Sequence, residues 1–171
     1  MNRVDVVLLM GSASDWPQLR PGVEVMRQLG LAYRVHVTSA HRTPERTVEL
    51  VRTSEQDGCR AFICAAGMAA HLAGVVAAHT VVPVLGVPLP GGVLDGVDAL
   101  LSTVQMPAGV PVATFAVGSA GARNAAFFAA QIIAADRPEV AAALEQARST
   151  GADKVVAADR ELRSEWDHGG D

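Results

Sequence analysis

The sequence has few aromatic residues, few cysteines and no block of basic residues. Phe, Trp and Tyr make up 4% of the 171 residues, so alanine, valine and glycine must fill most of the core. Small side chains let backbones approach closely, which suits tight layers or subunit contacts. The formal net charge is −4. The chain therefore lacks the basic surface expected of a nucleic-acid-binding protein, and any anion must be held by a few local donors.

Motifs for metals, disulfides and membranes are also missing. The histidines do not form HExxH, and Cys59 and Cys64 do not form CxxC, so we expect no metal. A regular strand would place the two thiols on opposite faces, and we expect both to be reduced. The N-terminus lacks the features of a signal peptide, and polar residues and prolines interrupt the apolar stretches. We therefore expect a cytoplasmic protein with no membrane partner.

Short apolar runs alternate with helical patterns along the whole chain. The runs predict strands over residues 4–10, 32–38, 60–65, 82–87 and 110–117. The stretches between and after them predict helices over residues 16–29, 44–56, 72–79, 94–102, 119–135 and 138–161. This alternation predicts a three-layer α/β/α sandwich, a flavodoxin-like parallel sheet of about five strands with helices on both faces. Without a linker or repeat, residues 1–163 form one domain and 164–171 a frayed tail.

Polar loops follow the first three predicted strands. Ligands of such sheets bind beyond the carboxyl ends of the strands, where neighbouring loops converge. The first loop offers backbone N–H groups and hydroxyls for an anion, from Gly11, Ser12 and Ser14. Asp15 can accept hydrogen bonds from ribose hydroxyls. Alternatively, Ser14 or Asp15 only caps the helix that follows.

The second and third loops carry histidines. Histidine is the side-chain type best suited to giving and taking a proton near neutral pH, which makes His41 the candidate acid–base group, and Arg42 beside it suits a phosphate. Thr43 and Pro44 predict a helix start in which the threonine side chain caps. His71 follows an apolar run, so it must bond a ligand, a backbone group or another loop. Both histidines also fit ordinary structural roles.

Six motifs occur together in one order and spacing: Gly11-Ser12-Ala13-Ser14-Asp15, Ser39-Ala40-His41-Arg42-Thr43-Pro44, Ala69-Ala70-His71-Leu72, Gly86-Val87-Pro88, Ser102-Thr103-Val104-Gln105-Met106-Pro107 and Asn124-Ala125-Ala126. In this arrangement the chain closely resembles the class I N5-carboxyaminoimidazole ribonucleotide mutases of de novo purine synthesis. The resemblance implies a flavodoxin-like homo-octamer that moves a carboxylate from the exocyclic nitrogen of an aminoimidazole ribonucleotide to ring carbon 4. It implies no cofactor, and functional coupling to the ATP-dependent synthase that makes the carbamate substrate.

The same resemblance implies roles for individual residues. His41 would be the acid–base catalyst, acting as a proton shuttle. The substrate would be bound by Gly11, Ser12, Ser14, Asp15, Ser39, Ala40, Arg42, Gly67, Met68, Ala69, Ala70, His71 and Leu72. Met68 and Ala73 stand where members of the family carry glycine and, in many cases, proline. These departures affect the shape of the expected CO2 pocket, and Pro90-Gly91-Gly92 is expected near a neighbouring subunit.

Two other functions fit parts of the pattern. One is an aminoimidazole ribonucleotide carboxylase that uses free CO2. In that related class the second loop carries lysine in place of arginine, and the third loop lacks the Ala-Ala-His pattern. Arg42 and His71 therefore favour the mutase. The other is a non-catalytic nucleotide- or flavin-binding module of the same fold. Flavin stacking usually needs aromatic side chains, and only Trp16 lies near the three loops.

Overall fold

A computed structural model describes residues 4–167 of the chain. Its centre is a parallel five-stranded sheet with the order β2-β1-β3-β4-β5. The strands are β1 (Val6–Met10), β2 (Tyr33–Val37), β3 (Ala61–Ala66), β4 (Val84–Pro88) and β5 (Ala113–Thr114). This order confirms the flavodoxin-like expectation that the first three strands are neighbours.

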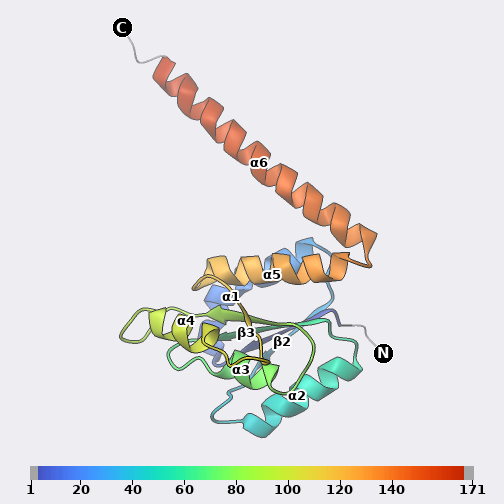
Figure 1. Cartoon of the computed structure of the whole chain (residues 1–171). Coiled ribbons are helices and arrows are strands. Elements are labelled where there is room, and N and C mark those ends of the chain that lie inside the picture. The colour runs from blue at the N-terminus through green and yellow to red at the C-terminus, as the bar shows by residue number, and fades with distance from the viewer. Residues whose placement is uncertain (1–3, 168–171) are drawn as a thin grey trace.

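Helices cover both faces of the sheet, as Figure 1 shows. A 3-10 turn, η1 (Ala13–Asp15), leads into the first helix. The helices are α1 (Trp16–Gln28), α2 (Pro44–Gln56), α3 (Leu72–Ala77), α4 (Val97–Val104), α5 (Ser119–Ala134) and α6 (Pro138–Asp167). Helices α1 and α5 lie together on one face, and α2 and α3 lie on the other.

The two faces of each central strand belong to different cores. In β1, Val6 and Leu8 pack in the cluster that includes α1 and α5. The alternate residues Val7 and Leu9 pack in the cluster on the opposite face, with Val76 of α3 among its members. Because successive strand side chains point to opposite faces, a continuous apolar run is what a doubly covered strand requires.

Cys59 and Cys64 belong to one core cluster, so the expected placement on opposite faces is wrong. Cys59 lies before β3 begins at Ala61, and strand alternation does not govern it. Both thiols are free and buried. Burial raises the pKa of Cys59 to about 11, and it raises the pKa of Cys64 further.

The fifth strand and the last helix differ most from their predicted bounds. The fifth strand has two residues instead of the predicted run over 110–117, because only Ala113 and Thr114 pair with β4. Helix α1 begins at Trp16, where it was predicted to begin, because Pro17 lies in the first turn, where a missing N–H breaks no helical bond. Pro21 lies within the helix.

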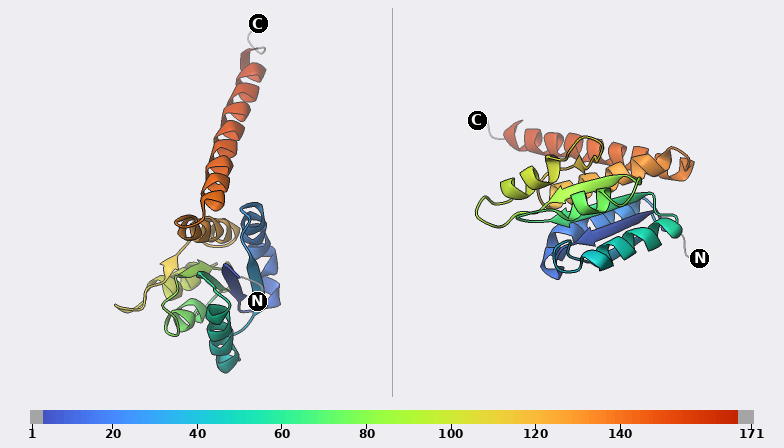
Figure 2. Two further views of the ribbon diagram at one scale, coloured as in Figure 1. Left: turned by 90° about the vertical axis from the view of Figure 1, so that its right-hand side faces the viewer. Right: turned by 60° about the horizontal axis from the view of Figure 1, so that its bottom comes forward.

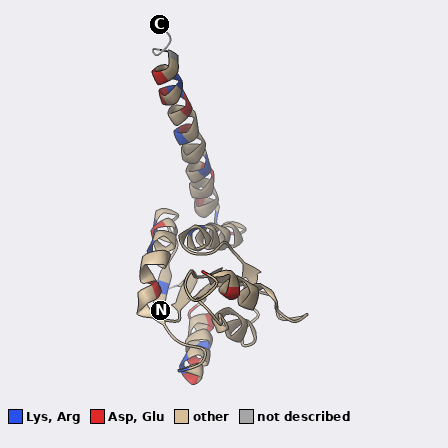
Figure 3. Ribbon diagram, turned by 90° about the vertical axis from the view of Figure 1, so that its left-hand side faces the viewer, with Lys and Arg blue, Asp and Glu red and all other residues tan. Residues whose placement is uncertain are grey.

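Helix α6 is longer than predicted and leaves the body of the molecule. It continues to Asp167, so the predicted frayed tail is helical over 164–167, and the rest of that tail lies outside the described residues. Figures 1 and 2 show the helix projecting well beyond the layers. Charges of both signs are interspersed along it in Figure 3. Only its first turns, around Val140 and Leu144, contact the core.

Candidate active site

Loops after four strands enclose one cavity of about 390 Å³ at the carboxyl edge of the sheet. All the residues expected from the sequence to contact the substrate line it, except Ala70. Ala70 is a residue of the third loop, but its side chain is buried, with only 2% exposed. The parallel strand order explains this convergence, because β2, β1, β3 and β4 are adjacent and their carboxyl ends share an edge.

The first loop is ordered by a capping box at the start of η1. The Ser12 backbone N–H donates to Asp15 Oδ2 at 2.9 Å, and the Ser14 N–H donates to Ser12 Oγ at 3.3 Å. The prediction that Ser14 or Asp15 caps the following helix is wrong: Ser12 is the N-cap of η1, Asp15 is its N3 partner, and Asp15 makes no side-chain cap bond to α1. Asp15 also lines the cavity. Partial burial raises the pKa of the Asp15 carboxyl, and the bond from Ser12 opposes that shift.

The second loop is held by Thr43 rather than capped by it. The Ser39 backbone N–H donates to Thr43 Oγ1 at 3.0 Å, and that hydroxyl also lies 3.1 Å from the Ser39 carbonyl oxygen. Thr43 makes no side-chain cap bond to α2, so the predicted capping role is wrong. Its hydroxyl instead closes the loop that carries His41 and Arg42. The Arg42 N–H donates to Ser39 Oγ at 3.2 Å and adds a second closure.

The two histidines of the site are hydrogen-bonded to each other. His41 Nε2 lies 2.7 Å from His71 Nδ1, and the rings meet edge to face at 84°. One nitrogen must donate and the other accept, so the pair fixes the tautomer of each neutral ring relative to the other. The sequence left His71 three possible partners: a ligand, a backbone group or another loop. In the structure its partner is His41 of the second loop. Both side chains are exposed to the cavity.

The loop after β4 is part of the site, which sequence reasoning missed. Leu89, Pro90, Gly91 and Gly92 line the cavity, together with Ala66 at the end of β3. The signal was present: this loop follows the fourth strand of the same sheet and is rich in Gly and Pro. The family resemblance instead implied a position near a neighbouring subunit for this segment.

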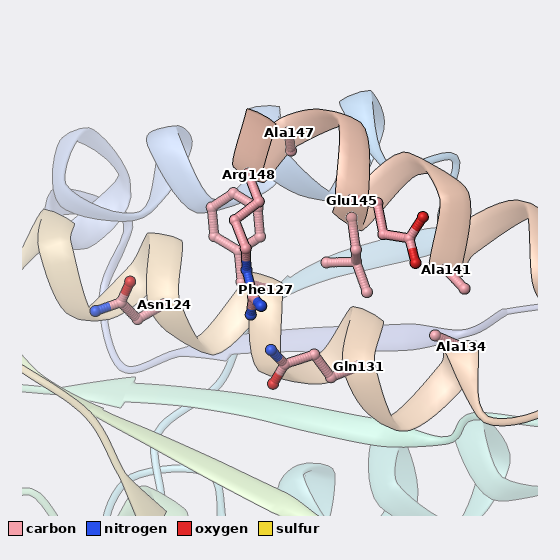
Figure 4. A pocket seen from close by; sticks show the side chains of 9 residues that line it. Asn124, Phe127, Gln131, Ala134, Ala141, Glu145, Ala147 and Arg148 are labelled. Atoms are coloured by element: carbon pink, nitrogen blue, oxygen red, sulfur yellow. The ribbon is translucent and has the colours of Figure 1, made fainter. Parts of the chain in front are cut away.

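A second cavity of about 470 Å³ lies between α5 and α6. Figure 4 shows Phe127 and Asn124 on one helix facing Arg148 and Glu145 on the other. Asn124 belongs to one of the sequence motifs, yet it lies here and not at the carboxyl edge of the sheet. None of the expected substrate-contacting residues lines this cavity.

Residues 4–167 contain no group of three or more His, Cys, Asp or Glu side chains placed to hold a metal ion. Over the same residues, no helix combines the length and apolar character needed to cross a membrane.

Comparisons with known proteins agree with one another. The family model for AIR carboxylase matches residues 5–154. The chain is 48% identical to an N5-carboxyaminoimidazole ribonucleotide mutase of Pseudomonas aeruginosa, over 88% of this chain and 93% of that protein. It is 45% identical to the Escherichia coli K12 protein of the same name, over 91% of this chain and 92% of that protein. A crystal structure of Treponema denticola PurE superposes with a TM-score of 0.84 at 28% identity, covering 94% of this chain and 99% of that one. The chain therefore belongs to the AIR carboxylase family.

Proposed function

We propose that the protein is an N5-carboxyaminoimidazole ribonucleotide mutase of de novo purine biosynthesis. The observation that carries this proposal is the cavity in which His41, paired with His71, lies beside Arg42 and Asp15. A proton-transfer group, a phosphate-binding cation and a ribose-binding carboxylate are thus gathered around one volume. The identity to named mutases over most of the chain supports the same conclusion.

Substrate binding follows from the chemistry of the loops. Arg42 and the hydroxyls of Ser12 and Ser14 bind the phosphate, since a guanidinium and hydroxyl donors suit its oxygens. Asp15 accepts hydrogen bonds from the ribose. One of its oxygens already accepts the Ser12 N–H, which leaves the other available in the cavity. The remaining contacts with the base are supplied by Gly11, Ser39, Ala40 and the loop from Gly67 to Leu72.

The reaction needs one group that first donates and then accepts a proton. His41 protonates the carbamate nitrogen, the nitrogen–carboxylate bond breaks, and CO2 leaves while the bonding pair stays on nitrogen. Carbon 4 of the electron-rich ring then attacks CO2 and forms the new carbon–carbon bond. His41 takes the proton from carbon 4, which restores the aromatic ring and the starting state of the enzyme. No proton is gained or lost overall, and no second base is required.

His71 acts as a positioning residue for His41. A 2.7 Å bond to His41 Nε2 orients the ring and fixes the relative tautomers. His41 donates from its protonated form: its Nδ1–H passes to the substrate, while its Nε2–H stays bonded to His71 Nδ1, so neither loop needs to move. The nearby walls are apolar and small, with Ala69 and Leu72 in the lining, and they exclude water from the released CO2.

The decisive experiment compares two substrates with the purified protein. Conversion of the carbamate to 4-carboxy-5-aminoimidazole ribonucleotide without added bicarbonate supports the mutase. Turnover only with aminoimidazole ribonucleotide and bicarbonate would assign the carboxylase instead. His41→Asn should abolish conversion while product binding stays detectable, and near-normal activity of that variant would refute the proton route.

We also propose that the protein is a cytoplasmic homo-oligomer, an octamer, coupled in function to the ATP-dependent synthase that makes its carbamate. Two features support assembly. Helix α6 carries exposed apolar side chains far from the core, namely Val155, Val156, Leu162 and Trp166. The alanine-rich α5 borders the groove in Figure 4. Light scattering should give a mass near eight chains, and a mass near the monomer's 17.8 kDa would refute assembly.

A further inference from the structure

Met68 has a backbone conformation that costs energy and places its side chain at the site. Its φ of +52° lies in the left-handed region, which side chains with a Cβ rarely adopt. Two tight turns hold it there, because the Ala70 N–H donates to the Met68 carbonyl and the His71 N–H donates to the Ala69 carbonyl, both at 2.9 Å. A conformation kept at such a cost needs a reason in the surrounding structure.

The side chain of Met68 connects two loops across the cavity. It projects from the loop after β3, and its Cγ lies where a methyl group on Gly92 would come within 3.1 Å. Gly92 belongs to the loop after β4 and has no side chain, so the Met68 stem lies against its bare backbone. Both residues line the same cavity as His41.

An apolar, flexible side chain in this place can cover a bound base. Met68 is 62% exposed and lines the cavity. A thioether on an unbranched stem turns readily, and its sulfur packs well against the edge of an aromatic ring. Contact with a bound imidazole would bury this apolar surface, which is favourable.

The reaction proposed above has a specific need for such a cover. CO2 carries no charge, and walls rather than hydrogen bonds must keep it beside carbon 4. Ala69, Leu72 and Leu89 supply apolar walls. Met68 adds a side chain that reaches from the loop after β3 to Gly92 of the loop after β4, beyond the point where Gly67 lies near the backbone of Leu89 and Pro90.

We propose that Met68 closes over the substrate's imidazole against Gly92 and sets the fraction of released CO2 that is recaptured. This inference rests on the proposed mutase function. Met68 is then a specificity-determining residue, because it separates transfer of the carboxylate from simple decarboxylation. Its loss allows CO2 and aminoimidazole ribonucleotide to leave the site separately.

The test follows the carboxylate carbon. Carbamate substrate labelled with ¹³C in the carboxylate is converted in excess unlabelled bicarbonate with carbonic anhydrase, which mixes any escaped CO2 into the unlabelled pool. The ¹³C content of the product and the free aminoimidazole ribonucleotide are measured, with an enzyme-free blank. The wild type should keep the label in most turnovers. Met68→Ala should release several-fold more label and more free aminoimidazole ribonucleotide.

Two variants separate the side chain from the backbone. Met68→Leu restores an apolar side chain of similar size, so its label retention should lie closer to the wild type than to Met68→Ala. Asp95→Gly is the matched control, because Asp95 also has a left-handed φ, of +47°, but does not line the cavity. It should retain label as the wild type does.

The outcomes are distinct. Retention in Met68→Ala equal to that of the wild type would overturn the role of Met68 alone, as would equal loss in Asp95→Gly. A wild-type protein that itself loses all label, or needs bicarbonate for turnover, would overturn the mutase function and this role with it.

Discussion

The hydrogen bond between His41 and His71 makes a quantitative prediction for His71→Phe. Phenylalanine keeps an aromatic ring of similar shape but removes the nitrogen that lies 2.7 Å from His41 Nε2. A hydrogen bond of this kind contributes about 0.5–1.5 kcal/mol net. If that energy serves to orient His41 in the transition state, kcat should fall roughly two- to thirteen-fold, since about 1.4 kcal/mol is a factor of ten. Product affinity should change less than kcat.

Single-turnover conversion of the carbamate and calorimetric binding of the product measure the two effects separately. His79→Phe is the matched control, because His79 is exposed and does not line the cavity, and it should behave as the wild type. His71→Gln supplies a side-chain amide that can hydrogen-bond His41, and it should recover part of the loss seen in His71→Phe. Equal rates for His71→Phe and His79→Phe would refute the positioning role. A loss as complete as that of His41→Asn would show that His71 itself transfers the proton.

Three further predictions concern stability and reactivity. Gly22→Ala should lower the free energy of unfolding by about 1–2 kcal/mol and Tm by several degrees, because the new Cβ would lie 2.5 Å from the Ala122 carbonyl oxygen. Gly151→Ala, whose new Cβ would meet no atom, should not lower either quantity, and thermal unfolding followed by circular dichroism compares the two variants. Asp15→Asn should raise Tm at pH 7, because burial raises the pKa of the Asp15 carboxyl and ionising that carboxyl therefore opposes folding. The gain in Tm should vanish as the pH falls below the range in which aspartate ordinarily titrates, and a lower Tm at pH 7 would refute this prediction. Native Cys64 should resist thiol reagents at pH 8 and react in urea, because burial raises its pKa, and rapid native labelling would contradict that burial.

Local sequence patterns predicted a helix or strand well where a single run of apolar side chains is enough to determine its type. The apolar run at 4–10 predicts a doubly buried strand, and β1 (Val6–Met10) is buried throughout. The prediction fails for β5, because a run of apolar residues at 110–117 does not say how many of them find partners on β4. It also fails for Thr43, whose hydroxyl bonds the loop before it instead of the helix after it.

The candidate site was predictable because strand ends are readable from the sequence. Parallel strands bring their carboxyl ends to one edge, so loops that follow neighbouring strands must converge once the order is known. Strand-end placement therefore predicts that His41, Arg42 and Asp15 belong to one site. It omitted the loop with Gly92, since the motif resemblance suggested a different surrounding for that segment.

The sequence by itself determined the alternation of strands and helices and the residue types at each strand end, because periodicities of two and 3.6 residues are local properties. Only the tertiary structure decided which distant groups meet. His41 and His71 are thirty positions apart and bond at 2.7 Å, and Met68 reaches Gly92 from another loop. These contacts depend on the strand order and on the backbone angles of the loops, which neighbouring residues alone do not fix. The long-range geometry therefore decides that His41 and His71 form a pair and that Met68 lies against Gly92 at the cavity.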